Sequence, residues 1–391
     1  MRASISSAST QSTREESISL SASNSNPFVL RHGRRYLRDP PYPLPCDLPE
    51  LQRQNLHTLL ATTVIGRALG SIPSPEHPPK RVLEIACGSG YWSSVCQEYL
   101  KSLGYEDVSF TGLDIVPVAG DLRKQGIDWR FIQHDLKKIP LPFDDGEFDI
   151  VMMKDLSMVV PLGSPSQRIL DEAMRILKSG GTLEIWETDH TIRSILPHPP
   201  APPGKIPEDD DAVAASTGTF LISTLTPFAE VQNKFLQDSN TWIQEALGKR
   251  KLTATPCARV TEMLLQETDT LCGVGSRRIA IPLGELRWER EAAADRNLTK
   301  RRGSEAAKGK RGTVGIESLI LTDDQAALRY TALLVVIQMI ESLEPLLKEV
   351  SGKNQEEWQR WWGFMMTNLL EQKGASSGEC LEVGVWWATK R

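Results

Sequence analysis

The middle of the chain alternates short apolar runs with segments that are long enough to form helices. Five such runs lie at 81–86, 108–113, 129–133, 148–153 and 181–186. Each has the length of a strand, and its nearly continuous apolar character is typical of strands that are buried on both faces. Strands that alternate with helices in this way form parallel sheets. The pattern therefore predicts an α/β fold in which a mostly parallel sheet carries helices on both faces.

Helical spacing marks three segments outside this region. In the first, Asp47 can cap a helix while Glu50 reaches back to it, and the expected apolar stripe consists of Leu51, Leu56, Leu59, Leu60 and Val64. Thr322 and Gln325 form a similar capping box at the start of a helix that runs to about Leu347, and Asn354 opens another. One face of that last helix holds Trp358, Trp361, Trp362, Met365 and Leu369. This face either packs into the core or forms the aromatic wall of a substrate pocket.

Composition divides the chain into segments. Residues 1–26 are rich in Ser, Thr, Asn and Gln, and they lack the apolar surface that could offset the entropy of ordering them, so we expect a disordered tail. A cap segment with its helix, 27–78, precedes a single large domain, 79–391. Within that domain, prolines predict a flexible loop at about 197–216. A basic insertion at about 291–315 is either a solvated segment or a nuclear-import signal.

The overall composition argues against several classes of protein. Of the 391 residues 40% are apolar, and the formal net charge is −5, so we expect no polycationic surface for nucleic acid. No stretch approaches the length of an uninterrupted apolar membrane span. The six cysteines are scattered without a C-x-x-C pair, and the chain does not start with a secretory segment. These features favour a reducing, cytoplasmic location and argue against structural zinc.

The segment with the clearest chemistry is 82–93, VLEIACGSGYWS, an apolar strand that is followed by a turn of small residues and the start of a helix. Gly88 and Gly90 allow the backbone to approach a ligand closely, and the helix directs its free N–H groups to the same place. A dinucleotide-binding turn requires a third glycine, where this chain has Ser93. Glu84 stands inside the strand, where it suits a ligand with an ammonium group rather than a pyrophosphate.

This segment resembles the first motif of the class I S-adenosylmethionine-dependent methyltransferases. Glu84, Gly88 and Gly90 match that motif, and Ala86 stands where the family usually has its first glycine. The resemblance implies S-adenosyl-L-methionine as the cofactor and these four residues as part of its site. It also implies the Rossmann-like fold of the family, with a mostly parallel, seven-stranded sheet.

Later segments match the same family in the same order. The acid that ends the second strand of the family binds the ribose hydroxyls, which implies this role for Asp114. The pair after the third strand contacts adenine, which implies this role for Asp135 and Leu136. Segments around 142–153 and 177–187 are similar to the family's fourth and fifth strands.

A narrower resemblance covers roughly residues 28–391. The segment that begins at Tyr42 and continues through Arg53 to His57 is similar to the N-terminal signature of fungal LaeA-like and related secondary-metabolism methyltransferases. In such proteins this segment covers the cofactor, which implies that Tyr42, Arg53 and His57 line the site. Alternatively, Tyr42 lies in a proline-stiffened turn, Arg53 pairs with Glu50 on the helix surface, and His57 packs inside the helix.

Few catalytic residues are expected, because methyl transfer from a sulfonium mainly requires a positioned nucleophile. Lys154 and Asp155 follow the fourth strand at the carboxyl edge of the sheet, where open α/β sheets bind substrates. Asp155 is the candidate catalytic base, with a turn role as the alternative. Glu187 and Asp189 lie at the same edge. The sequence has no pattern for a divalent metal, and we predict a metal-independent enzyme.

Two kinds of function fit these observations. The first is O- or N-methylation of a small organic molecule, in a pocket covered by the Tyr42 segment, the 197–216 loop and the tryptophan helix. The second is a LaeA-like regulatory protein that binds the cofactor, or a protein methyltransferase, acting through partner proteins in the nucleus. The first is the preferred hypothesis, and neither includes nucleic acid or a membrane as a partner.

Overall fold

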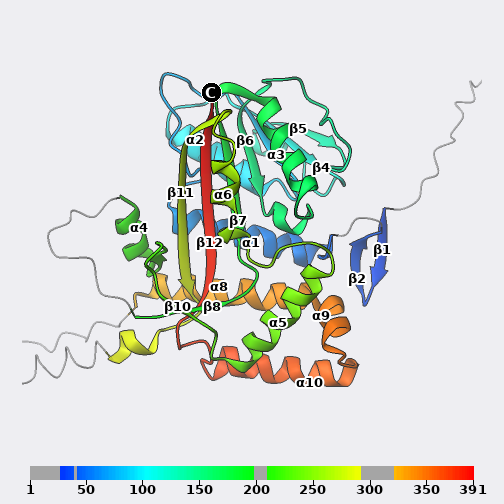
Figure 1. The fold of residues 1–391 in the computed structure, drawn as a ribbon, viewed down its shortest axis with the longest axis vertical. Helices are drawn as coiled ribbons and strands as arrows, with labels where there is room; N and C mark the ends of the chain where they lie inside the picture. The colour runs from blue at the N-terminus through cyan, green and yellow to red at the C-terminus, as the bar shows by residue number, and fades with distance from the viewer. Residues whose placement is uncertain (1–26, 39–41, 198–208, 292–320) are drawn as a thin grey trace, which may run out of the picture.

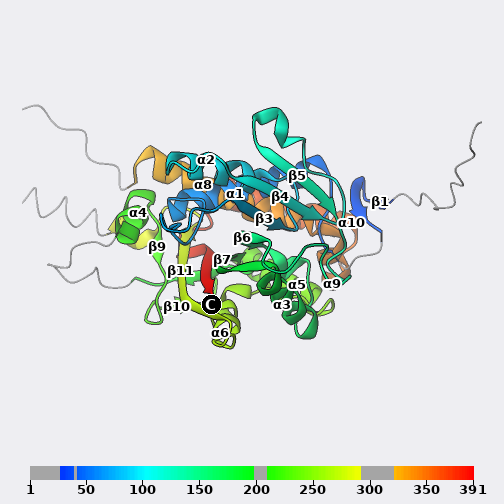
Figure 2. The same ribbon diagram turned by 90° about the horizontal axis from the view of Figure 1, so that it is seen from above.

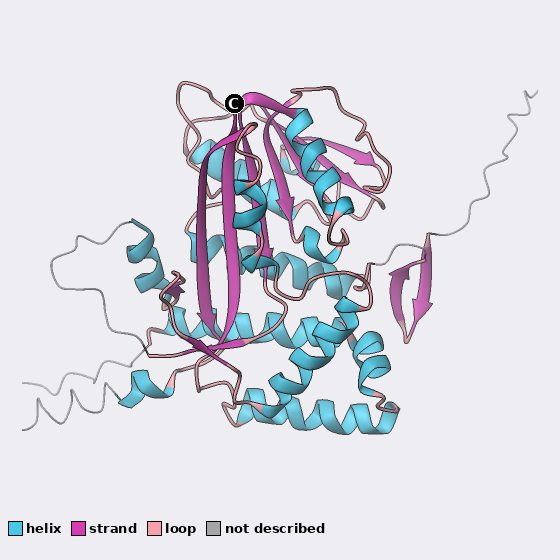
Figure 3. Ribbon diagram, viewed as in Figure 1, coloured by secondary structure: helices cyan, strands magenta, loops and turns pink. Residues whose placement is uncertain are grey.

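The central sheet contains the five strands that the apolar runs predict (Figure 1). They are β3 (Arg81–Ile85), β4 (Ser109–Asp114), β5 (Asp128–Gln133), β6 (Phe148–Lys154) and β7 (Leu177–Thr188). The computed structural model describes residues 27–38, 42–197, 209–291 and 321–391, and Figure 3 separates its helices from its strands. All five strands run parallel.

Two long strands extend the sheet beyond β7. β12 (Glu379–Lys390) pairs antiparallel with β7, and β11 (Leu271–Pro282) pairs antiparallel with β12. The order across these seven strands is therefore β5-β4-β3-β6-β7-β12-β11, which confirms the expected mostly parallel α/β sheet. Three short strands enlarge the sheet to ten, namely β8 (Arg193–Ile195), β9 (Phe220–Leu221) and β10 (Phe228–Ala229).

The chain reverses its direction across the sheet between β3 and β6. From β3 it builds outward through β4 to β5, and it then returns to the other side of β3 to form β6. The connections that leave β3 and β6 therefore diverge and open a crevice at the carboxyl ends of these strands. In open α/β sheets this crevice is where ligands bind.

Helices cover both faces of the sheet (Figure 2). One face carries α1 (Leu48–Ile65), α2 (Tyr91–Ser102) and α8 (Asp323–Ser342). The other face carries α3 (Ser164–Ile176) and α6 (Val260–Leu265). Consecutive residues of β3 enter opposite cores, since Val82 packs in the first cluster and Leu83 in the second. This alternation follows from the two-residue period of a strand.

The helix α1 begins where the sequence predicts, but it buries a different face. Asp47 caps the helix by accepting a hydrogen bond from the N–H of Glu50. The Glu50 carboxylate binds Arg53 instead of reaching back. The predicted leucine stripe is wrong in part, because Leu59 is 47% exposed. Polar side chains occupy much of the buried face, namely Glu50, Arg53, His57, Thr58 and Thr62.

A helix replaces part of the loop expected at 197–216. α4 (Asp209–Thr217) starts with three aspartates, and carboxylates in a first turn favour a helix because they interact with the positive end of its dipole. Asp210 also pairs with Arg277 of β11. Residues 198–208, the tail 1–26 and nearly all of the basic insertion (292–315) lie outside the described residues.

The C-terminal helices form a layer beyond the carboxyl ends of the parallel strands (Figure 1). The Thr322–Gln325 capping box opens α8 as predicted, and α5 (Lys234–Gly248), α9 (Glu344–Ser351) and α10 (Gln355–Met366) complete the layer. Trp358 and Trp361 of α10 are buried against Trp242 of α5, with 4.8 Å between the ring centroids of Trp242 and Trp361. The tryptophan face therefore packs into the core. The prediction that it covers a substrate pocket is wrong.

Within the described ranges, no helix taken alone has the length and apolar character of a membrane span. The pair α8 and α9 reaches that length and composition together, but the chain bends by 66° between the two helices. Apolar side chains of α8, among them Ala332, Leu333 and Val336, are buried in the core.

Candidate functional site

The turn between β3 and α2 has a backbone that suits small residues. Ala86 (φ 53°), Gly88 (φ 51°) and Gly90 (φ 73°) all adopt positive φ values, a region in which a Cβ atom is disfavoured. Gly90 is the N-cap of α2, so the unpaired N–H groups of the first helical turn lie here. A Cβ atom on Gly88 would lie 3.1 Å from Oε1 of Gln54 in α1. A larger residue at position 88 would therefore narrow the space between the turn and α1.

Two adjoining cavities lie along this turn. The large cavity has a volume of about 400 Å³ and is lined by six of the predicted site residues, namely Tyr42, Ala86, Gly88, Asp114, Asp135 and Leu136. The small cavity has a volume of about 90 Å³ and is lined by Glu84. Tyr42, Ala86 and Gly88 line both. Gly90 is the exception among the predicted residues, since it faces Leu122 and Trp129 and shapes the turn from behind.

Asp114 lies at the end of β4 and holds the turn. Its Oδ2 accepts a 2.9 Å hydrogen bond from the N–H of Gly88. Burial raises the pKa of Asp114, although hydrogen bonds from the N–H groups of Gly88 and Val116 oppose this effect. The neighbouring Ile115 and Val116 and the more distant Leu136 give the large cavity apolar walls. A carboxylate beside apolar walls can bind a hydroxylated sugar that carries a flat ring.

Glu84 is buried in β3, with only 4% of its surface exposed. Its Oε2 accepts a 2.6 Å hydrogen bond from Oγ of Ser93, the residue that replaces the third glycine of a dinucleotide turn. Burial is the main cause that raises the pKa of Glu84 to about 7. A cationic ligand group beside this carboxylate would lower that pKa again.

The helix α1 forms one wall of the small cavity. Arg53 and His57 of the N-terminal signature both line it. Arg53 does pair with Glu50, as the alternative interpretation expects, but the pair is buried rather than on the surface. Gln54, Asn55 and Thr58 also line the cavity and were not predicted, because only the packing of α1 against the turn brings them there. Gln54 donates a 3.1 Å hydrogen bond to the hydroxyl of Tyr42.

Asp155 lies after β6, forms an ion pair with Lys154 and contacts the ring of His57, whose pKa is lowered by burial. Its Oδ2 contacts Nζ of Lys154 and lies 3.4 Å from Nδ1 of His57. Burial by itself would raise the pKa of Asp155, but Lys154 and His57 together lower it well below its usual range. A carboxylate with so low a pKa is a weak base. The geometry therefore favours a positioning role for Asp155 over the predicted role as the catalytic base.

Three further titratable groups lie at the end of β7 or directly after it. Oε1 and Oε2 of Glu187 accept hydrogen bonds of 2.9 and 2.6 Å from the N–H and Oγ of Ser157, and burial raises the pKa of Glu187 to about 8. His190 lines the small cavity, and burial lowers its pKa to about 4, so the ring is neutral at pH 7. Asp189 lines a third cavity of about 30 Å³, next to α5 and α8, which His190 shares.

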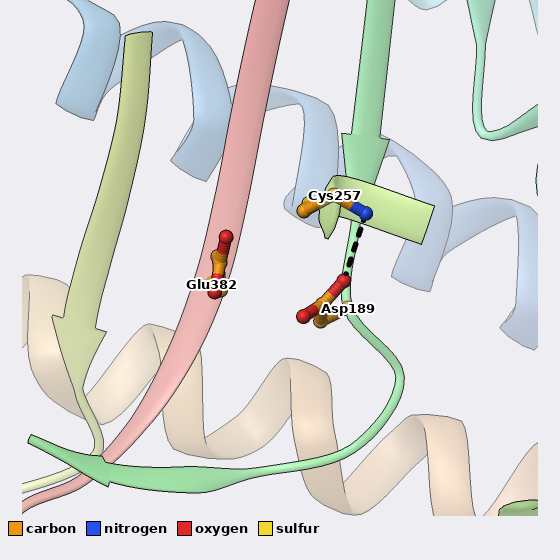
Figure 4. Close-up of side chains that lie close together, drawn as sticks. All are labelled: Asp189, Cys257 and Glu382. Atoms are coloured by element: carbon orange, nitrogen blue, oxygen red, sulfur yellow. Dashed lines mark hydrogen bonds between the residues drawn. The ribbon is translucent and has the colours of Figure 1, made fainter. Parts of the chain in front are cut away.

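Asp189 also belongs to a buried cluster with Cys257 and Glu382 (Figure 4). The ligand atoms of these three residues lie within 4.8 Å of one another. Asp189 accepts a 3.0 Å hydrogen bond from the N–H of Cys257, and Glu382 pairs with Arg193 and Arg278. Because two arginines already balance the charge of Glu382, internal partners account for the cluster, and metal independence stays a prediction.

Comparison with known proteins gives a sequence match to the site itself. Residues 82–181 match the family described as a methyltransferase domain. The phthiotriol/phenolphthiotriol dimycocerosates methyltransferase of Mycobacterium tuberculosis is 34% identical over 154 residues, which cover 37% of this chain and 48% of the relative. The malonyl-[acyl-carrier protein] O-methyltransferase of Serratia marcescens is 29% identical over 109 residues, which cover 28% of this chain and 38% of the relative. The chain thus spans about half or less of the length of these curated relatives.

Solved structures give weaker likenesses. The match to the YcgJ protein of Bacillus subtilis covers 86% of this chain and 98% of the YcgJ chain, with 15% sequence identity and a TM-score of 0.36. The match to the N-methyltransferase NodS of Bradyrhizobium japonicum, solved with S-adenosyl-L-homocysteine, covers 36% of this chain and 62% of the NodS chain. The sequence identity is 16% and the TM-score is 0.25. Residues 82–181 therefore match a methyltransferase domain, and they lie in a mostly parallel α/β sheet.

Proposed function

We propose that the chain is an S-adenosylmethionine-dependent methyltransferase that methylates an oxygen or nitrogen of a small organic molecule without a metal. The observation that carries this proposal is the pair of adjoining cavities. They bring the glycine turn and Asp114 together with Asp135 and the polar face of α1. The cofactor supplies an activated methyl group on a sulfonium sulfur.

The residues at the large cavity fit the adenosyl part of this cofactor. Asp114 would present a carboxylate oxygen to the ribose hydroxyls, and Ile115, Val116 and Leu136 would offer apolar surface to adenine. Asp135 uses Oδ1 for the N–H of Lys137, so its other oxygen is the one that would accept from the adenine amino group. The methionine part would extend along Ala86 and Gly88 into the small cavity, where Glu84 lies near its ammonium group.

The acceptor site belongs at the far side of the small cavity. Lys154, Asp155 and His190 line it there, at the carboxyl ends of β6 and β7. The small cavity has a volume of about 90 Å³ and would also hold the methionine part, so we propose a small acceptor rather than a large one. The relatives named above include a methyltransferase of phthiotriol and phenolphthiotriol dimycocerosates and an O-methyltransferase of malonyl-[acyl-carrier protein]. Because these relatives act on different acceptors, the assignment of a small organic acceptor to this chain is itself part of the proposal.

The LaeA-like resemblance and the cellular location stay predictions. Tyr42, Arg53 and His57 line the cavities, and this position is consistent with the resemblance without testing a fungal or regulatory role. We propose a cytoplasmic location. Import into the nucleus through the basic insertion is the alternative, and that segment lies outside the described residues.

Calorimetric titration with S-adenosyl-L-homocysteine tests the cofactor site. We expect the wild-type protein to bind it and Asp114→Ala to bind at least about tenfold more weakly, because hydrogen bonds to a charged group contribute about 1.5–3 kcal/mol. Asp128→Ala is the matched control, since Asp128 is an exposed residue at the start of the neighbouring strand β5. Failure of the folded wild type to bind would contradict the enzyme proposal and favour a scaffold that acts through partner proteins.

A further inference from the structure

Glu187, Ser157 and His190 form a hydrogen-bonded row between two cavities. Oγ of Ser157 lies 2.6 Å from Oε2 of Glu187 and 3.4 Å from Nε2 of His190. His190 lines the small cavity, where the methyl acceptor is proposed to bind. Glu187 and Ser157 line a separate cavity of about 90 Å³ between α3 and the segment around α6. The row therefore joins the acceptor site to the opposite side of β6 and β7.

The other ring nitrogen of His190, Nδ1, lacks a hydrogen-bond partner among the described residues. This nitrogen atom is buried. His190 as a whole residue is 7% exposed, and it lines both the small cavity and the third cavity beside Met339. A buried polar atom without a partner is unfavourable in a folded protein, and such an atom beside a cavity indicates a ligand group that completes its hydrogen bonding.

We propose that this row is a proton relay, in which Nδ1 of His190 accepts the proton of a hydroxyl-bearing methyl acceptor and Glu187 receives a proton at the other end. The inference rests on the proposed methyl transfer. It assigns His190 to the contact with the acceptor, Ser157 to the transfer between the two groups, and Glu187 to storage of the proton.

The step balances in atoms and charge. The acceptor oxygen bonds to the methyl carbon while the carbon–sulfur bond of the sulfonium donor breaks, and that electron pair goes to sulfur. The hydroxyl proton moves to Nδ1 of His190, the Nε2 proton moves to Oγ of Ser157, and the proton of Ser157 moves to Oε2 of Glu187. The positive charge of the sulfonium and the negative charge of Glu187 disappear together.

The surroundings of the row suit this transfer. Charged and titratable groups face the row from several elements: Lys154 at the end of β6 and Asp155 after it, Arg53 and His57 of α1, Asp189 after β7, and Cys257 and Arg259 before α6. Burial, and the nearby charge of Asp155, raise the pKa of Glu187 to about 8. Its carboxylate therefore holds a proton far better than an exposed glutamate does. His190 is neutral at pH 7, and its Nδ1 is able to accept a proton in the fraction of molecules in which Glu187 is ionised, a fraction that grows as the pH rises toward about 8.

The row makes the tautomer of His190 depend on Glu187. When Glu187 is ionised, Ser157 donates to it and accepts from the Nε2–H of His190, which leaves the lone pair on Nδ1. When Glu187 is protonated, it donates to Ser157, Ser157 donates to Nε2, and the ring proton moves to Nδ1. The ring changes its tautomer without changing its charge.

Nitrogen NMR on protein with 15N-labelled histidine tests this coupling without any ligand. The chain has six histidines, and His190→Asn identifies the His190 signals by their loss. In the wild type we expect the proton to move from Nδ1 to Nε2 as the pH rises through about 8. Glu187→Gln, which imitates the protonated acid, is expected to keep the proton on Nδ1 throughout. Ser157→Ala is expected to remove the pH response while His190 stays in place.

Three results would overturn the relay. The first is a wild-type tautomer that does not change between about pH 6 and about pH 9, and the second is a change that persists in Ser157→Ala.

The third result concerns the contact between His190 and the acceptor. Phenol added to protein saturated with S-adenosyl-L-homocysteine is expected to shift the Nδ1 signal, whereas toluene, which lacks the hydroxyl group, is not. Equal effects of the two probes, or none, would contradict the contact. Loss of S-adenosyl-L-homocysteine binding contradicts the proposed enzyme instead, and it leaves the coupling of the tautomer intact.

Discussion

Ala86 is the residue at which the turn departs from glycine. Its φ of 53° lies in the left-handed region, where a residue with a Cβ atom costs about 1–2 kcal/mol. The residue lines both cavities, so its methyl group is part of the ligand-facing surface. The turn thus keeps the conformation of a glycine-rich loop with an alanine in it.

Replacing this alanine tests that strain. In Ala86→Gly, relief of the strain is partly offset by the greater entropy of glycine in the unfolded chain, about 0.4–1 kcal/mol. We expect a net gain of about 0.5–1 kcal/mol in the free energy of unfolding, measured with urea. Ala327→Gly, at an exposed position of α8, is the control and is expected to lose about 1 kcal/mol. Equal losses in both variants would show that Ala86 is unstrained.

The helix α1 connects the small cavity, which Arg53 lines, to the C-terminal layer through a buried ion pair. Glu50 is fully buried and accepts hydrogen bonds of 2.9 and 2.7 Å from Arg53 and one of 2.7 Å from Oγ of Ser342, in the last turn of α8. Burying one charge without its partner is costly, whereas a satisfied pair is tolerated.

Arg53→Met is therefore expected to destabilise the protein by about 3–5 kcal/mol, because it leaves Glu50 buried and unpaired. The double variant Glu50→Gln/Arg53→Met removes both charges and is expected to recover most of that loss. Urea unfolding at pH 7 measures both values. If the double variant is no more stable than the single one, the ion pair is not what stabilises α1.

The elements show what a sequence can reveal about this molecule. Runs of apolar residues located all five parallel strands because strand burial depends on local composition. The pattern of apolar residues did not predict the polar face of α1, since Gln54, Asn55 and Thr58 line the small cavity only because α1 packs against the glycine turn. The resemblance to a family supplied Asp114, Asp135 and Leu136 at the large cavity. The role of His190 depends on a missing hydrogen bond, which only coordinates show.

In the whole molecule, the aromatic cluster of Trp242, Trp358 and Trp361 lies apart from the cavities in which methyl transfer is proposed. Trp361 donates a 2.9 Å hydrogen bond to Asp238 and packs against Trp242 and Trp358. The cluster joins α5 to α10, and none of its three tryptophans is among the described residues that line the large or the small cavity. Its contribution is therefore to the stability of the C-terminal layer.

Trp361→Ala is expected to lower the stability of the whole protein without changing ligand binding at the cavities. Loss of the ring is expected to cost about 3–5 kcal/mol, as for other buried tryptophans, and to lower the melting temperature. The affinity for S-adenosyl-L-homocysteine, measured at a temperature at which the variant is folded, is expected to stay within about twofold, a difference of about 0.4 kcal/mol. A larger change would mean that the layer transmits its packing to the cavities.

The position of β12 has a consequence for synthesis of the chain. This strand lies between β7 and β11 and pairs with both, although it is made after both of them. On the ribosome, β7 and β11 are complete well before the strand that joins them, and each exposes an unpaired edge during that interval. Exposed strand edges favour wrong pairing between chains. We therefore expect newly made chains to depend on chaperones until residues 379–390 have emerged, a vulnerability that the finished protein no longer has.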